Sequence, residues 1–160
     1  MSKYTFIVSN CPLPEIDLTG TVRMKYGEYK KLNIQSTHES ILDQLDDMDD
    51  EAAILIMEST KMHHLKIALC TNQPYGLEEY IQKEFIYWLE GSSDDLTWKE
   101  QLYAYLKEQQ NNMNGLEIWS IWFGDGQQDI EKMTIKLSEL QRSDLEALKG
   151  VRNNYSIQFE

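Results

Sequence analysis

Carboxylates gather in one short stretch of the chain, where six acidic side chains lie between residues 43 and 51. An EF-hand calcium loop needs oxygen ligands at fixed spacing and a glycine at its sharp turn. This stretch has no glycine and the wrong spacing, so it does not predict a metal site. Like charges three and four residues apart destabilise a helix, and this predicts an exposed loop.

Two interpretations of this acidic loop follow: it is simply solvated, or it is a contact surface for a basic protein. Close carboxylates would steer a basic partner toward such a surface. The residues assigned to the predicted contact surface are Asp46, Asp47, Asp49, Asp50 and Glu51.

Histidine and cysteine do not form a recognisable metal or nucleophile motif. His63 and His64 are adjacent, so in a strand their side chains point to opposite faces and do not share a metal. Cys11 and Cys70 stand alone, whereas a zinc site needs His or Cys clusters. Cys70 with a histidine of a neighbouring strand would be a nucleophilic pair, but a free cysteine is more often a small buried core residue. We expect no metal and no cofactor.

Serine and glycine motifs of enzymes are also missing. No serine lies in a G-x-S-x-G context, and Gly124-Asp125-Gly126 lacks both the dinucleotide fingerprint and the phosphate loop. These glycines predict a turn. The sequence therefore favours a protein that is not an enzyme. The alternative is a small-molecule enzyme with carboxylates as general acid and base, because the chain has 27 acidic residues.

The four tryptophans separate into two pairs. Trp88 and Trp98 fit the apolar stripes of two predicted helices, and core packing explains them. Trp119 and Trp122 fall on opposite faces of one predicted strand, so one of the two side chains can face solvent. An exposed tryptophan beside acidic residues suits a protein interface. Core packing is the favoured interpretation of this pair as well, and Trp119 is the candidate anchor if one of the two is exposed.

Net charge limits the partners. The 160 residues carry 15 basic and 27 acidic side chains, and 15 − 27 gives −12. Phosphate backbones and anionic membranes repel such a protein, so we predict no direct nucleic-acid binding and no membrane binding. The N-terminal residues lack the pattern of a signal peptide, and the longest apolar run, Ala52–Met57, is too short for a membrane helix. We expect a soluble, reduced, cytoplasmic protein.

Periodicity predicts the elements that position these residues. Apolar residues between Leu77 and Leu89 recur at helical spacing before Gly91, and Thr97-Trp98-Lys99-Glu100 matches a capping box. These patterns predict helices over 77–90 and 97–110, and Ser143-Asp144-Leu145-Glu146 opens a short third helix ending near Gly150. The strands are predicted at 4–8, 53–58, 65–70, 116–123, 132–137 and 155–159.

The segregated order of these elements predicts an α+β fold in one domain, residues 1–160. We expect a mixed, mostly antiparallel sheet centred on residues 116–123. Two main helices would pack on one face, with a short C-terminal helix in addition. The runs 53–58 and 65–70 are predicted to form a β-hairpin.

Three segments carry a resemblance: residues 74–81, residues 118–126 and the run Asp46-Asp47-Met48-Asp49-Asp50. They resemble uncharacterised small acidic proteins of Gram-positive bacteria, a group that brings no activity to transfer. By analogy of size and charge, the leading hypothesis is an acidic protein-binding module, in its most concrete form an immunity-type inhibitor of a basic toxin or nuclease. Besides the small-molecule enzyme, a nucleic-acid mimic is the other alternative.

Overall fold

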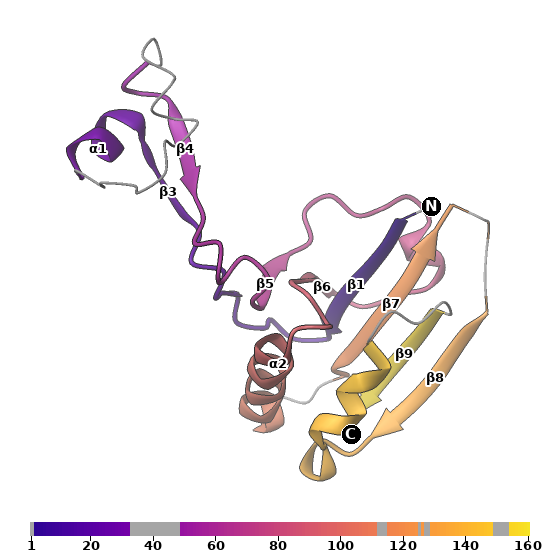
Figure 1. Ribbon diagram of the computed structural model, residues 1–160. Helices are drawn as coiled ribbons and strands as arrows, with labels where there is room; N and C mark the ends of the chain where they lie inside the picture. Colours follow the sequence, from indigo (N-terminus) through magenta and orange to yellow (C-terminus); the bar gives the residue numbers. More distant parts are fainter. Residues whose placement is uncertain (1, 33–48, 112–114, 125, 127–128, 149–153) are drawn as a thin grey trace. The chain divides into compact units, whose positions relative to one another are not determined.

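The computed structural model describes residues 2–32, 49–111, 115–124, 126, 129–148 and 154–160 (Figure 1). Its backbone contacts divide the chain into two compact units. We call residues 1–19 with 63–160 the sheet unit, and residues 20–62 the hairpin unit. Each is described by itself below. That residues 1–160 form one domain stays a prediction.

The sheet unit contains a seven-stranded, mostly antiparallel sheet, as predicted. Among the described strand pairs of this sheet, only β8 and β9 run parallel to each other. β1 is the middle strand, and β7, which covers most of the predicted central strand, lies beside it. In spatial order the strands are β2 (Ile16–Asp17), β5 (Lys66–Leu69), β6 (Phe85–Glu90), β1 (Ser2–Ser9), β7 (Glu117–Phe123), β9 (Asn154–Phe159) and β8 (Ile130–Ile135).

One face of this sheet is covered by helices. The main helix is α2 (Leu96–Glu108), and the predicted helix over 97–110 is thereby confirmed. Its N-cap is Asp95, whose carboxylate accepts the backbone N–H groups of Thr97 and Trp98, so the predicted cap at Thr97 was two residues late. The described part of the unit also contains the 3-10 helices η2 (Leu77–Glu79), η3 (Gln109–Asn111), η4 (Leu137–Glu139) and η5 (Arg142–Leu148).

The larger buried core lies between the helices and this face. Leu102 and Leu106 of α2 and Leu145 of η5 are fully buried there. They pack in one cluster with Ile7 and Ile118, which lie opposite each other on β1 and β7. Burial of these side chains from water is the main term that holds α2 on the sheet.

The predicted helix over 77–90 is wrong. The first three residues form η2, and Phe85–Glu90 form β6, which pairs with β5 and with β1. Five consecutive apolar residues, 85–89, serve a strand covered on both faces better than one helical stripe. The predicted short helix near 143–150 is the 3-10 helix η5.

The predicted hairpin of residues 53–58 and 65–70 is also wrong, because β4 (Ala53–Ile56) belongs to the hairpin unit. There it pairs with β3 (Val22–Lys25), and α1 (Tyr26–Lys31) follows β3 directly. Tyr26 and Ile54 are buried in this unit. β5 pairs instead with β2 and β6, in the sheet unit.

Candidate functional site

The predicted acidic contact surface lies partly outside the described residues, since Asp46 and Asp47 fall in the range 33–48. Its described carboxylates are exposed but engaged. Asp50 forms an ion pair with Lys30, and Glu51 forms one with Lys25 at 2.6 Å. Asp49 accepts the backbone N–H of Glu51 at 3.0 Å. Lysines of the same hairpin unit thus neutralise part of the negative charge that was predicted to attract a basic partner.

Trp119, the predicted anchor, is only 8% exposed. It belongs to the second buried cluster of the sheet unit, with Phe6 and Ile121 among its members. Its indole N–H donates to the Glu117 carboxylate at 2.7 Å. Trp119 therefore packs as a core residue, the interpretation that the sequence favoured, and its role in partner binding stays a prediction.

Aromatic rings do gather on the sheet face that α2 leaves uncovered. The strand register places Phe6 opposite both Trp88 and Trp119, so these three side chains share one face. Tyr4 lies two residues before Phe6 on the same face, and Phe123 lies two residues after Ile121, the partner of Tyr4. Three neighbouring strands, β6, β1 and β7, thus present aromatic side chains together.

The rings of this group are in contact. The Tyr4 ring centroid lies 5.5 Å from that of Trp88 and 5.8 Å from that of Phe123, both in tilted geometry. Phe123 in turn meets Tyr80 at 6.1 Å in a perpendicular arrangement. Tyr4 is 37% exposed and the other three rings are half-buried. We call Tyr4, Tyr80, Trp88 and Phe123 the aromatic face.

Residues of the aromatic face take part in lining two hollows. The first has a volume of about 410 Å³ and is lined by Tyr4, Trp88 and Glu90 together with Lys3, Thr5, Leu89 and Gly91. The second has a volume of about 290 Å³ and is lined by Tyr75, Tyr80, Phe123 and Glu79 together with Gly76, Trp122, Gly124 and Gly126. The side chains that line each hollow include one carboxylate, Glu90 in the first and Glu79 in the second.

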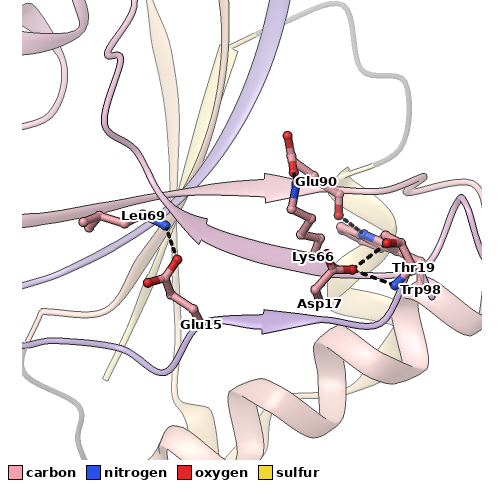
Figure 2. A network of polar contacts seen from close by, with 7 residues as sticks. All are labelled: Glu15, Asp17, Thr19, Lys66, Leu69, Glu90 and Trp98. Carbon is pink, nitrogen blue, oxygen red and sulfur yellow. Dashed lines mark hydrogen bonds and ion pairs between the residues drawn. The ribbon is translucent and has the colours of Figure 1, made fainter. Parts of the chain in front are cut away.

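The two carboxylates differ in their surroundings. Glu90 forms an ion pair with Lys66 at 2.7 Å, and the hydrogen bond to Glu90 raises the pKa of that lysine (Figure 2). The first hollow also contains Lys3, whose pKa is lowered mainly by burial and raised to a smaller extent by Asp94. Glu79 is exposed, and in the described part of the chain it lies in no ion pair.

A further group of carboxylates near β2 has structural partners (Figure 2). Glu15 accepts the backbone N–H of Leu69 at 2.8 Å, beside the two-residue strand β2. Asp17 accepts the backbone N–H of Thr19 at 2.9 Å and also its hydroxyl. These side chains satisfy the backbone where regular pairing stops, so they are explained without a ligand.

A third hollow, of about 500 Å³, is lined partly by Glu139, Asp144 and Glu160. Glu139 pairs with Lys136 at 3.5 Å, and Asp144 accepts the backbone N–H of Gln141 at 2.7 Å. Two of these carboxylates are thus engaged in local structure.

The described cysteines and histidines, the candidates for a metal ligand or a nucleophile, are Cys11, Cys70, His63 and His64. Within the described ranges, no group of three or more His, Cys, Asp or Glu side chains is placed to hold a metal ion. Cys70 is buried, and burial raises the pKa of its thiol, an effect only partly offset by a backbone hydrogen bond to Asn72. A raised pKa disfavours the thiolate that a nucleophile needs.

Comparison of the chain with protein families, curated proteins and solved structures gave no match. Among the described helices, none is both long and apolar enough to cross a membrane. Function is therefore inferred from the side chains themselves.

The sequence prediction missed the aromatic face because it placed Trp88 in the stripe of a helix. One signal was available. Tyr4 and Phe6 are spaced by two in a β-branched and aromatic run, so they share a strand face. Their partners Trp88 and Phe123 come from distant parts of the chain, and only the sheet register shows that they meet.

Proposed function

We propose that this protein is a binding module for a basic protein and that the aromatic face is its contact surface. The observation that carries the proposal is the ring of Tyr4, which is 37% exposed and lies in contact with Trp88 and Phe123. Tyr4 and Trp88 line one hollow, and Phe123 lines another. Binding hot spots in interfaces are enriched in tyrosine and tryptophan, and they fill or border pockets. A cluster of half-buried aromatic rings on a sheet offers such anchors in a rigid arrangement.

Charge selects the class of partner. Aromatic rings on a sheet could also stack nucleic-acid bases, but a net charge of −12 repels the phosphate backbone. The same charge accelerates encounter with a basic protein and makes the association sensitive to salt. The most concrete form of this proposal is an immunity-type inhibitor, which would cover the active site of a basic toxin or nuclease.

The test is capture from a native cell lysate by the tagged protein, with elution in steps of rising salt and identification by mass spectrometry. A Tyr4→Ala variant is run in parallel. The matched control is Met133→Ala, because Met133 is exposed to a similar extent, 41%, and lies on edge strand β8 away from the aromatic face. Circular dichroism and the melting temperature establish that both variants are folded.

We expect a protein of high isoelectric point that wild type and Met133→Ala retain, that salt releases, and that Tyr4→Ala loses. An acidic partner held independently of salt would contradict the proposal. So would a basic partner that Tyr4→Ala binds as well as the wild type does.

A further inference from the structure

The second hollow combines aromatic rings with a carboxylate. Tyr75 is 98% exposed, in the turn before η2, and Gly76 beside it has a φ of +85°. Tyr80 and Phe123 form a perpendicular corner, with centroids 6.1 Å apart. Glu79 completes this side of the hollow. The faces of aromatic rings carry negative electrostatic potential, so rings and carboxylate together favour a cation.

The chain already holds a guanidinium group in an arrangement of this kind. The guanidinium of Arg142 lies 4.8 Å from the ring centroid of Tyr103. Its Nε also pairs with the Glu100 carboxylate at 2.5 Å. On the surface of this protein, an arginine thus packs against one tyrosine ring and pairs with one glutamate.

We propose that the second hollow receives an arginine side chain of the partner, with its guanidinium beside Tyr75, Tyr80 and Phe123 and its N–H groups donating to Glu79. This inference rests on the proposed function, since it names the group by which a basic protein is recognised. Arginine fits better than lysine because its planar guanidinium stacks on rings and pairs with a carboxylate through two N–H groups.

The first hollow is the weaker site for a cation. Lys3 lines it and repels a second positive charge, and its carboxylate Glu90 is already paired with Lys66. Glu79 in the second hollow has no such competitor among the described residues. The second hollow disfavours anions such as phosphate groups, because Glu79, the charged side chain among its described lining residues, is acidic.

The experiment titrates ¹⁵N-labelled protein with the blocked peptide Gly-Arg-Gly and follows amide chemical shifts. The comparison peptide contains citrulline, which keeps the shape of arginine but has no charge. Two variants are matched: Glu79→Gln removes the carboxylate that lines the hollow, and Glu78→Gln removes the same charge from the adjacent exposed residue, which does not line it.

We expect saturable shifts at Gly76, Tyr80 and Phe123 with the arginine peptide, and none with the citrulline peptide. Glu79→Gln should weaken binding roughly fivefold, as expected for loss of an exposed charge pair, and Glu78→Gln should bind as the wild type does. Shifts spread over the surface, or equal loss in both variants, would overturn the arginine site.

Capture of the basic partner separates this inference from the proposed function. A partner that Tyr4→Ala loses and Glu79→Gln retains at full strength would overturn the arginine site and leave the binding module standing. Localised arginine binding with an acidic partner in the capture experiment would overturn the proposed function alone.

Discussion

The indole N–H of Trp98 donates a hydrogen bond of 2.8 Å to the backbone carbonyl oxygen of Glu90, and this bond joins the first turn of α2 to the end of β6 (Figure 2). Between the two elements stands Gly91, with a φ of +111°. A Cβ atom on Gly91 would collide with the Trp98 indole and would lie 2.6 Å from the carbonyl oxygen of His64. The glycine thus allows the ring to close over the strand end.

Gly91→Ala should therefore destabilise the protein strongly. The substitution adds backbone strain to a collision with a buried ring, and we expect a loss of about 3 kcal/mol in the free energy of unfolding. Urea denaturation measures it. Gly76→Ala is the control, since Gly76 has a φ of +85° but nothing within 4 Å of its added Cβ, so only the strain of about 1 kcal/mol remains. Equal losses in the two variants would contradict the collision at Trp98.

Gly91 also shows how far the sequence predicted the fold. A glycine after an apolar stripe is a sound signal for the end of an element, and an element does end there. The residues before it match the helical period, yet they form β6, because β5 and β1 offer hydrogen-bonding partners on both sides. Local periodicity does not contain this information, which comes from strands at residues 2–9 and 66–69.

The candidate site was hidden from the sequence for the same reason. Asp50 and Glu51 were predicted to be exposed, and they are. Their ion-pair partners Lys30 and Lys25 come from α1 and its N-cap, 20 and 26 residues earlier in the chain. The acidic run considered by itself therefore overestimates the negative charge that is free to attract a partner. The aromatic face likewise depends on the pairing of distant strands, and no window of the sequence contains it.

The Lys99–Glu146 ion pair offers a second prediction. The Lys99 side chain is buried on α2, and its ammonium group meets the half-exposed carboxylate of Glu146 at 2.8 Å. Glu146→Gln leaves a buried charge without its opposite charge, so it should cost about 1–2 kcal/mol, reduced from the value of a fully buried pair by the exposure of Glu146. Lys99→Met removes the buried charge itself and should cost less.

Urea denaturation of both single variants and of the double variant gives the coupling between the two residues. Glu100→Gln is the control, because it breaks the pair with Arg142, in which both side chains are well exposed. That control should change stability by less than about 0.5 kcal/mol. A larger loss for Lys99→Met than for Glu146→Gln would show that packing of the lysine stem, and not its charge, dominates.

Asp95 makes the stability of α2 dependent on pH. The backbone N–H of Trp98 has the largest effect and lowers the pKa of the Asp95 carboxyl below its ordinary 3.8. Desolvation opposes it, and smaller contributions from Thr97 and from the electrostatic effect of His64 lower the pKa further. Because the pKa of Asp95 is lower in the folded state, its ionised carboxylate stabilises the protein at pH values above the pKa of the unfolded chain. This stabilisation is lost as the pH falls below 3.8 and passes through the pKa of the folded state.

Asp95→Asn keeps a side-chain acceptor at the N-cap but has no charge to lose. Its melting temperature should be lower than that of the wild type at pH 7, and the two should converge as the pH falls below about 3.8. Thermal unfolding followed by circular dichroism across this range measures the difference. A constant difference at every pH would mean that the carboxylate charge does not contribute.

The two thiols should react at very different rates, and the order tests whether a nucleophile has been overlooked. Cys70 is buried and its pKa is raised by that burial, whereas Cys11 is half-buried, with its sulfur 3.3 Å from the Ser9 hydroxyl. With iodoacetamide at pH 8, Cys11 should be fully alkylated while Cys70 is still mostly unmodified, because reaction needs an accessible thiolate. Mass spectrometry of the digested protein follows both sites, and in urea the two rates should become similar.

Faster reaction at Cys70 in the folded protein would restore the nucleophilic pair with a histidine as a working hypothesis and would weaken the case for a binding module without catalysis.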